Sequence, residues 1–153
     1  MKLAHQVEIR VFSKENEDYQ RIISGLKSLF PFSLEENKIA VSETCAEGFD
    51  EKKIRIAEVV VSRESLVKMF LKSIISKLSD EQVEMLNRQI DSRVDDEENF
   101  FLRLDKERLL SANEYFITDS GNCYHIKITV AAFPKKREVA ASIARQILKK
   151  ESN

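Results

Sequence analysis

The stretch CYHIKITVAAFP, residues 123–134, alternates apolar and polar side chains along most of its length. The apolar positions are Tyr124, Ile126, Ile128 and Val130. The polar positions between them are His125, Lys127 and Thr129. A period of two residues is typical of a strand with one buried face. We therefore predict a strand from Cys123 to Phe133 that ends at Pro134, which lacks a backbone donor.

Similar patterns elsewhere in the chain predict the other elements. Further strands are expected over 3–12, 33–43, 52–61, 100–104 and 115–117, and apolar residues at helical spacing predict helices over 19–30, 63–78, 80–93, 106–111 and 135–150. Three side chains are placed to cap helices: Ser62, Ser79 and Asp105. Pro31 ends the first helix.

This order of elements favours an α+β fold. Hairpins outnumber crossover connections, so we expect one domain over residues 1–153, with a mixed, mostly antiparallel sheet and helices packed on one face. The opposite face of the sheet is then solvated or available to a partner.

Composition limits the classes of function. The chain has 153 residues and a formal net charge of −1, with 25 Lys and Arg against 26 Asp and Glu. A dedicated nucleic-acid binder usually has a basic excess, because the release of counterions drives its affinity. Any affinity for RNA must therefore come from a local basic patch and should be modest.

Neither targeting nor disulfide signals are present. The N-terminal residues lack an unbroken apolar segment, and no run approaches the roughly 20 apolar residues of a membrane helix. Cys45 and Cys123 are too few and too far apart for a Cys-x-x-Cys motif, and we interpret both as buried thiols in a reducing compartment. We expect a cytoplasmic protein that does not associate with membranes.

Catalytic signatures are missing as well. The two histidines, His5 and His125, fall in predicted strands without a nucleophile motif nearby, so we interpret them as structural or surface residues. The acidic run 95–98 lacks the spacing of a calcium-binding loop, and three scattered glycines cannot form a phosphate loop. We expect a protein that is not an enzyme, with no cofactor and no metal site.

The most informative local feature is Phe133-Pro134-Lys135-Lys136-Arg137. Three cations stand at the start of the last predicted helix, where the partial positive charge of the backbone favours acidic residues. A broken local rule can mark a functional surface, and free amides at a helix start can also bind phosphate. The alternative is a solvated charged turn between a strand and a helix.

Other cations could join this cluster, and the fold decides whether they converge: Arg103, Lys106 and Lys127 are the candidates. Stacking on bases would also require exposed aromatic rings. Phe49 and Tyr115 are the two candidates for exposure, although packing under a loop is the simpler interpretation of each.

Two segments of the C-terminal half resemble those of a known archaeal family. They are NFFLRLDK, residues 99–106, and IKITVAAFPKKRE, residues 126–138. The family is described as predicted RNA-binding proteins or candidate exosome subunits. The resemblance covers nearly the whole chain and departs from the family pattern at 47–50 and 107–111.

The resemblance implies a fold like that of the ribosomal protein that binds 5S ribosomal RNA, and a link to archaeal RNA processing. It brings no catalytic residues with it. The possible RNA contacts that it implies are Arg103, Lys106, Lys135, Lys136 and Arg137.

Two hypotheses of different classes follow. The first is a module that binds structured RNA through a local basic patch, in the company of RNA-processing proteins. The second is a protein–protein adaptor or homodimer that associates through the open sheet face or an edge strand. The near-neutral charge favours the second, and the resemblance favours the first.

Overall fold

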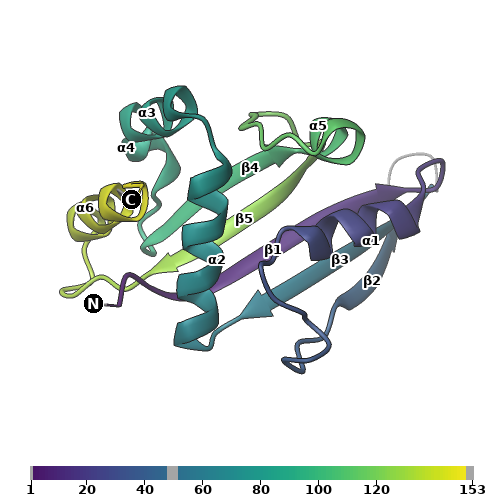
Figure 1. The fold of residues 1–153 in the computed structure, drawn as a ribbon, viewed down its shortest axis with the longest axis horizontal. Coiled ribbons are helices and arrows are strands. Elements are labelled where there is room, and N and C mark those ends of the chain that lie inside the picture. The colour runs from purple at the N-terminus through teal and green to yellow at the C-terminus, as the bar shows by residue number, and fades with distance from the viewer. Residues whose placement is uncertain (1, 48–51, 151–153) are drawn as a thin grey trace. The chain divides into compact units, whose positions relative to one another are not determined.

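The computed structural model describes residues 2–47 and 52–150, and its strands form one five-stranded antiparallel sheet (Figure 1). The strands are β1 (Ala4–Lys14), β2 (Ser42–Glu47), β3 (Lys53–Val61), β4 (Asn99–Asp105) and β5 (Cys123–Val130). Their order in the sheet is β2-β3-β1-β5-β4. The predicted α+β class with a mostly antiparallel sheet is therefore confirmed.

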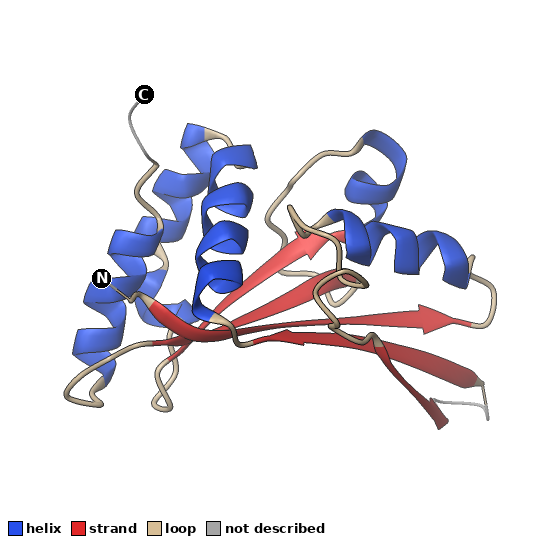
Figure 2. Cartoon of the chain, turned by 60° about the horizontal axis from the view of Figure 1, so that its bottom comes forward, coloured by secondary structure: helices blue, strands red, loops and turns tan. Residues whose placement is uncertain are grey.

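The chain divides into two compact units, and four strands contribute residues to both. Unit 1 holds residues 2–7, 61–102 and 127–150 of the described chain, and unit 2 holds residues 8–60 and 103–126, apart from those outside the description. In each unit the helices lie over one face of the strands (Figure 2).

The helices of unit 2 are α1 (Tyr19–Ser28) and α5 (Lys106–Ala112). Asp18 caps α1 by accepting a hydrogen bond from the Arg21 amide at 3.2 Å. The buried side of α1 meets Tyr124, a fully buried residue of β5 whose hydroxyl donates to the Ile22 carbonyl at 2.8 Å. Burial also raises the pKa of the Tyr124 hydroxyl, so it remains a donor.

The helices of unit 1 are α2 (Glu64–Lys77), α3 (Asp80–Arg88), α4 (Ile90–Arg93) and α6 (Arg137–Ile147). Helix α2 buries an apolar stripe that consists of Leu66, Val67, Phe70, Leu71, Ile74 and Ile75. The Ser79 hydroxyl caps α3 by accepting from the Gln82 amide at 3.2 Å. The ammonium of Lys150 donates to the Leu78 carbonyl at 2.6 Å and pairs with Asp80 at 3.0 Å, which ties the end of the described chain to the start of α3.

Several predicted elements are confirmed and some boundaries move. Ser79 and Asp105 cap helices as expected, but the N-cap of α2 is Arg63 rather than Ser62, with no side-chain hydrogen bond. The helix predicted over 80–93 is broken at Gln89 into α3 and α4. The strand predicted over 115–117 is reduced to an isolated bridge between Leu104 and Ile117.

The prediction of a strand over 33–43 is wrong. Residues 34–38 form turns, residues 39–41 have no regular secondary structure, and β2 starts only at Ser42. Side-chain hydrogen bonds explain the difference: the Ser33 hydroxyl accepts from the Glu36 amide at 3.1 Å, and the Asn37 amide group donates to the Ser33 carbonyl at 2.7 Å. Such local bonds compete with strand pairing for the backbone groups. The buried side chain of Leu34 anchors the turns.

No helix among the residues that the structure describes is long and apolar enough to cross a membrane.

Helix α1 approaches β5 so closely that only glycine fits at one position. A Cβ atom on Gly25 would lie 2.4 Å from the Tyr124 hydroxyl oxygen and 2.5 Å from a Leu110 methyl carbon. The Tyr124 ring cannot yield easily, because it is buried and its hydroxyl is hydrogen-bonded.

We predict that Gly25→Ala lowers the free energy of unfolding by about 1–3 kcal/mol, the usual result of overpacking a core. Urea denaturation measures the change. Gly121→Ala is the matched control, because a Cβ there meets no atom within 4 Å. Equal stability of the two variants would contradict the packing described here.

Candidate nucleic-acid interface

The six cations predicted to contact RNA are divided between the units. Arg103 and Lys106 belong to unit 2, whereas Lys127, Lys135, Lys136 and Arg137 belong to unit 1. The two groups differ in the contacts that their charged side chains make.

Lys106 is a structural residue of unit 2. Its side chain is 5% exposed, and its ammonium donates to the Phe12 carbonyl at 2.6 Å and pairs with the Glu17 carboxylate at 3.3 Å. Asp105 caps α5 by accepting from the Arg108 amide at 2.9 Å, which fixes Lys106 at the first helical position. These contacts occupy the charge that we had assigned to RNA, so Lys106 is left out of the proposed surface.

Arg103 is half-buried on β4, and its guanidinium donates to the Asp119 carbonyl at 2.9 Å. The neighbouring thiol of Cys123 is buried, and burial raises its pKa, an effect that Arg103 and Lys106 only partly oppose. A thiol with a raised pKa is a poor nucleophile, so Cys123 is an inert buried thiol, as expected. Cys45 is exposed on β2, so its interpretation as a buried thiol was wrong.

Arg137 faces inward, unlike the two lysines that precede it. Its Nε donates to the Val94 carbonyl at 3.1 Å, and its Nη2 donates to the Asp91 carbonyl. These carbonyls lie at the end of α4, where a cation interacts favourably with the helix dipole. Arg137 thus joins the start of α6 to the end of α4.

Residues 133–136, which we call the basic–aromatic loop, are exposed together. Phe133 is 92% exposed, the largest exposed fraction among the large apolar side chains of the described residues, and Lys135 and Lys136 are exposed beside it. Lys136 is the N-cap of α6, and no side chain caps this helix. An aromatic ring, two ammonium groups and uncapped amides therefore share one short segment of unit 1.

Sequence reasoning missed the exposure of Phe133. It assigned most phenylalanines to the core, although the alternation along β5 contained the signal. The buried positions of this segment are even-numbered and continue from Tyr124 through Val130 to Ala132, so Phe133 falls in the outward phase. Lys127 lies on the half-buried, odd-numbered face of the same strand.

The other aromatic and histidine residues considered from the sequence do not form a second site in the described part of the chain. Tyr115 is buried, which confirms that it packs under a loop, and Phe49 lies outside the described residues. His5 is exposed and His125 is half-buried, each on its own strand. Within residues 2–47 and 52–150, no group of three or more His, Cys, Asp or Glu side chains is arranged to hold a metal ion.

Unit 2 has an open sheet face of its own. The Arg55 guanidinium lies 4.5 Å from the centre of the Tyr19 ring of α1, so the odd-numbered residues of β3 face the helix. The even-numbered residues face the other way, where Glu58 pairs with Arg10 of β1 at 2.9 Å. Phe12 and Val60 share this face and are 43% and 42% exposed.

Comparison with known proteins identifies the family of this chain. A family model described as RNA binding matches residues 6–132, which is most of the chain. The chain belongs to this RNA-binding family. A curated relative, "RNA-binding protein PAB1135" of Pyrococcus abyssi, is 26% identical over 148 residues, which cover 97% of this chain and 96% of that protein.

Solved structures of similar proteins have the same fold. Protein AF2318 from Archaeglobus fulgidus is 24% identical, with a TM-score of 0.83 over 94% of this chain and 99% of that one. Mth689 from Methanothermobacter thermautotrophicus is 26% identical, with a TM-score of 0.73 over 96% of this chain and 99% of that one. These two archaeal proteins thus share this arrangement of strands and helices.

We predict that Lys106→Met lowers the free energy of unfolding by about 2 kcal/mol, because it leaves the Phe12 carbonyl without its donor and the Glu17 carboxylate without its partner. Lys136→Met, on an exposed residue, should change stability by less than about 0.5 kcal/mol. Urea denaturation of both variants checks the ranking. The reverse order would mean that Lys106 is not the structural cation described here.

Proposed function

We propose that this protein binds RNA without catalysing a reaction, and that the basic–aromatic loop is its principal contact. The observation that carries the proposal is the exposure of Phe133 next to Lys135 and Lys136 in a chain of the RNA-binding family. The Phe133 ring is 92% exposed and therefore gains almost no stability from packing against the protein. Its placement on the surface calls for another explanation.

The chemistry of the loop favours unpaired bases. Every base has a flat face that stacks on an aromatic ring, and lysine ammonium groups bind the phosphates between the bases. A-form RNA duplexes hide their bases, whereas loops and bulges of a structured RNA splay them out. We therefore expect the loop to recognise unpaired nucleotides within a structured RNA.

Two further cations can extend the contact within their own units: Lys127 on β5 and Arg103 on β4 remain candidates, with lower weight than the loop because both are half-buried. We also propose a cytoplasmic role in archaeal RNA processing next to exosome subunits or other RNA-processing proteins. The relative named an RNA-binding protein supports contact with RNA. The family resemblance supports the link to archaeal RNA processing. The likeness to the ribosomal protein that binds 5S ribosomal RNA stays a prediction.

The loop can be tested by removing its charges and its ring separately. In fluorescence anisotropy with a labelled single-stranded RNA, we expect Lys135→Ala with Lys136→Ala to weaken binding. The slope of log affinity against log salt should fall by about 1.4 because two phosphate contacts are lost. Phe133→Leu should weaken binding by about fivefold or more and leave the salt slope unchanged, because stacking carries no charge.

The matched control is Lys52→Ala with Lys53→Ala, an exposed lysine pair in unit 2 with the same change in net charge. This control should lower affinity less than the loop variant. RNA binding that survives both loop variants and fails in the control would move the contact surface away from unit 1.

A second candidate function rests on the open face of unit 2. Phe12 and Val60 expose apolar surface on a sheet face that also holds the Arg10–Glu58 pair. Directly paired residues of β2 and β3 share a face, so Thr44 and Ala46 lie on it together with Ile56 and Ile54. This mixed surface suits association with a second copy of the chain or with a partner protein.

If this face mediates self-association, sedimentation at micromolar concentration should give a mass above 17.7 kDa. Phe12→Ser with Val60→Ser should restore the monomer. Met69→Ser, on an apolar side chain of α2 that is 44% exposed, should leave the mass unchanged. A monomeric unaltered protein would exclude self-association through this face.

A further inference from the structure

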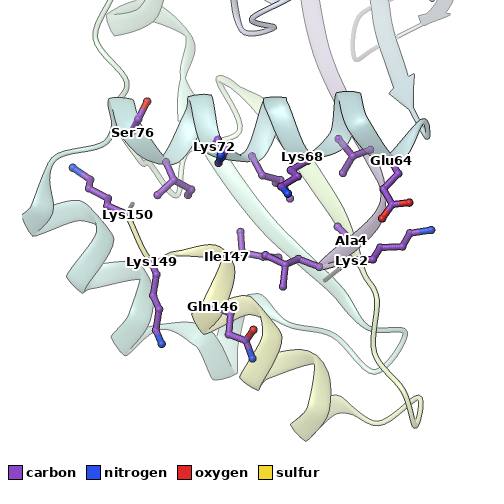
Figure 3. Close-up of a pocket in the computed structure, with 14 residues that line it drawn as sticks. Lys2, Ala4, Glu64, Lys68, Lys72, Ser76, Gln146, Ile147, Lys149 and Lys150 are labelled. Carbon is purple, nitrogen blue, oxygen red and sulfur yellow. The ribbon is translucent and has the colours of Figure 1, made fainter. Parts of the chain in front are cut away.

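Unit 1 contains an apolar groove that the RNA proposal does not use. Its volume is about 410 Å³, and it lies between α2, the end of α6 with the residues that follow, and the first described residues of the chain (Figure 3). The lining comes from three segments that are far apart in the sequence: residues 2–4, 64–76 and 146–150. None of the described lining residues belongs to the basic–aromatic loop, so the groove is a separate surface of unit 1.

The floor of the groove is aliphatic and follows helix α2. The buried side chains of Val67, Leu71 and Ile75 line it from this helix. They recur every four residues, so they form one line of about 12 Å at a rise of about 1.5 Å per residue. The buried side chain of Ile147 adds to the floor from α6. A second helix with apolar residues at the same spacing presents a stripe that fits this line.

Five lysines line the groove, and two of them are already engaged. The ammonium of Lys150 pairs with Asp80 at 3.0 Å and donates to the Leu78 carbonyl at 2.6 Å. Lys72 also has an interaction within the protein. Neither of these two charges is therefore available to a ligand.

The other three lysines are exposed, and each comes from a different segment of the lining: Lys2, Lys68 and Lys149. Within the described residues, no hydrogen bond or ion pair ties their ammonium groups to another residue. Figure 3 shows Lys68 on the side of α2 that borders the groove. Glu64 is the one carboxylate among the described lining residues. The available charge around the apolar floor is thus positive, and it favours an acidic ligand.

We propose that this groove is the docking site for an acidic amphipathic helix of a partner protein. The apolar stripe of the helix lies along Val67, Leu71 and Ile75, and carboxylates beside the stripe face Lys68 and the lysines of the other two segments. Apolar contact contributes affinity in proportion to the area removed from water. The lysines select the partner by the sign of its charge, and their alkyl stems extend the apolar surface.

The lining favours a helix over an extended peptide or RNA. An extended peptide adds to a sheet through a free strand edge, but Ala4, the lining residue from a strand, belongs to β1, which lies between β3 and β5. None of the described lining residues is aromatic, so a base has no ring on which to stack. A helix satisfies its own backbone hydrogen bonds and needs only apolar side chains against such a floor.

The first test selects for the chemistry of the partner. Peptides of about 16 residues, displayed on phage with randomised positions in an alanine-rich helical background, are selected against the full chain. The enriched sequences should have apolar residues at i, i+4 and i+8 with Asp or Glu beside them. With the Lys68→Glu variant as the target, the enriched charges should shift from acidic towards basic, because the new carboxylate repels acidic peptides.

One enriched peptide, labelled with fluorescein, then gives affinities by fluorescence anisotropy. Lys68→Glu should weaken its binding by about tenfold, since a repulsion replaces an attraction of similar size. Lys135→Glu makes the same change of charge on an exposed lysine outside the groove, and it should leave peptide binding unchanged. Because Lys135 belongs to the basic–aromatic loop, this control should weaken RNA binding instead, which separates the two proposals.

Three results would overturn the proposal. The first is a selection that enriches no acidic amphipathic sequence. The second is an enriched peptide that binds the Lys68→Glu and Lys135→Glu variants equally well. The third is binding of single-stranded RNA that Lys68→Glu abolishes and Lys135→Glu does not affect, which would assign the groove to RNA.

Discussion

The alternation along β5 is the constraint on which the rest of the structure depends. The even-numbered side chains of this strand, from Tyr124 to Val130, are all buried, and Ala132 continues the series. In unit 2 the strand meets α1 through the Tyr124 hydroxyl and the bare backbone of Gly25. In unit 1 the same parity leaves Phe133 outside the core. A shift of one residue would turn every side chain to the other face, so packing and the exposed ring are fixed by one register.

Much of the fold could be predicted from the sequence because its main elements have strong periodicity. The burial of β1, β3 and β5 largely follows a period of two residues. Ser79 and Asp105 are recognisable as N-caps because each bonds a backbone amide three residues further along the chain. The turns at 34–38 were missed because the side chains of Ser33 and Asn37 form hydrogen bonds with the local backbone. The alternation of apolar and polar residues does not reveal whether a polar side chain will bond the local backbone, and such a bond competes with strand pairing.

The candidate site was less predictable, because a cation in a sequence does not show its partner. Lys106 is neutralised by Glu17, 89 residues away, and Arg137 binds carbonyls more than 40 residues before it. Nothing local distinguishes these residues from the exposed Lys135 and Lys136. A groove of unit 1 that is lined by residues from 2–4, 64–76 and 146–150 was missed for the same reason, because these segments are far apart in the sequence. Periodicity reports which face is buried, and only the tertiary structure reports which charges are already used.

A near-neutral protein can therefore have a local surface that binds anions. The 25 cations and 26 anions of this chain are not evenly distributed. In unit 1, the described residues that line the groove between α2 and the end of α6 include five lysines and one carboxylate, whereas the turn at 95–98 is wholly acidic. At physiological salt, charges separated by more than about 8 Å act almost independently. A phosphate or carboxylate close to such lysines thus responds to them rather than to the net charge of −1. The net charge of this chain therefore does not describe the local charge that an anion would meet at either lysine cluster.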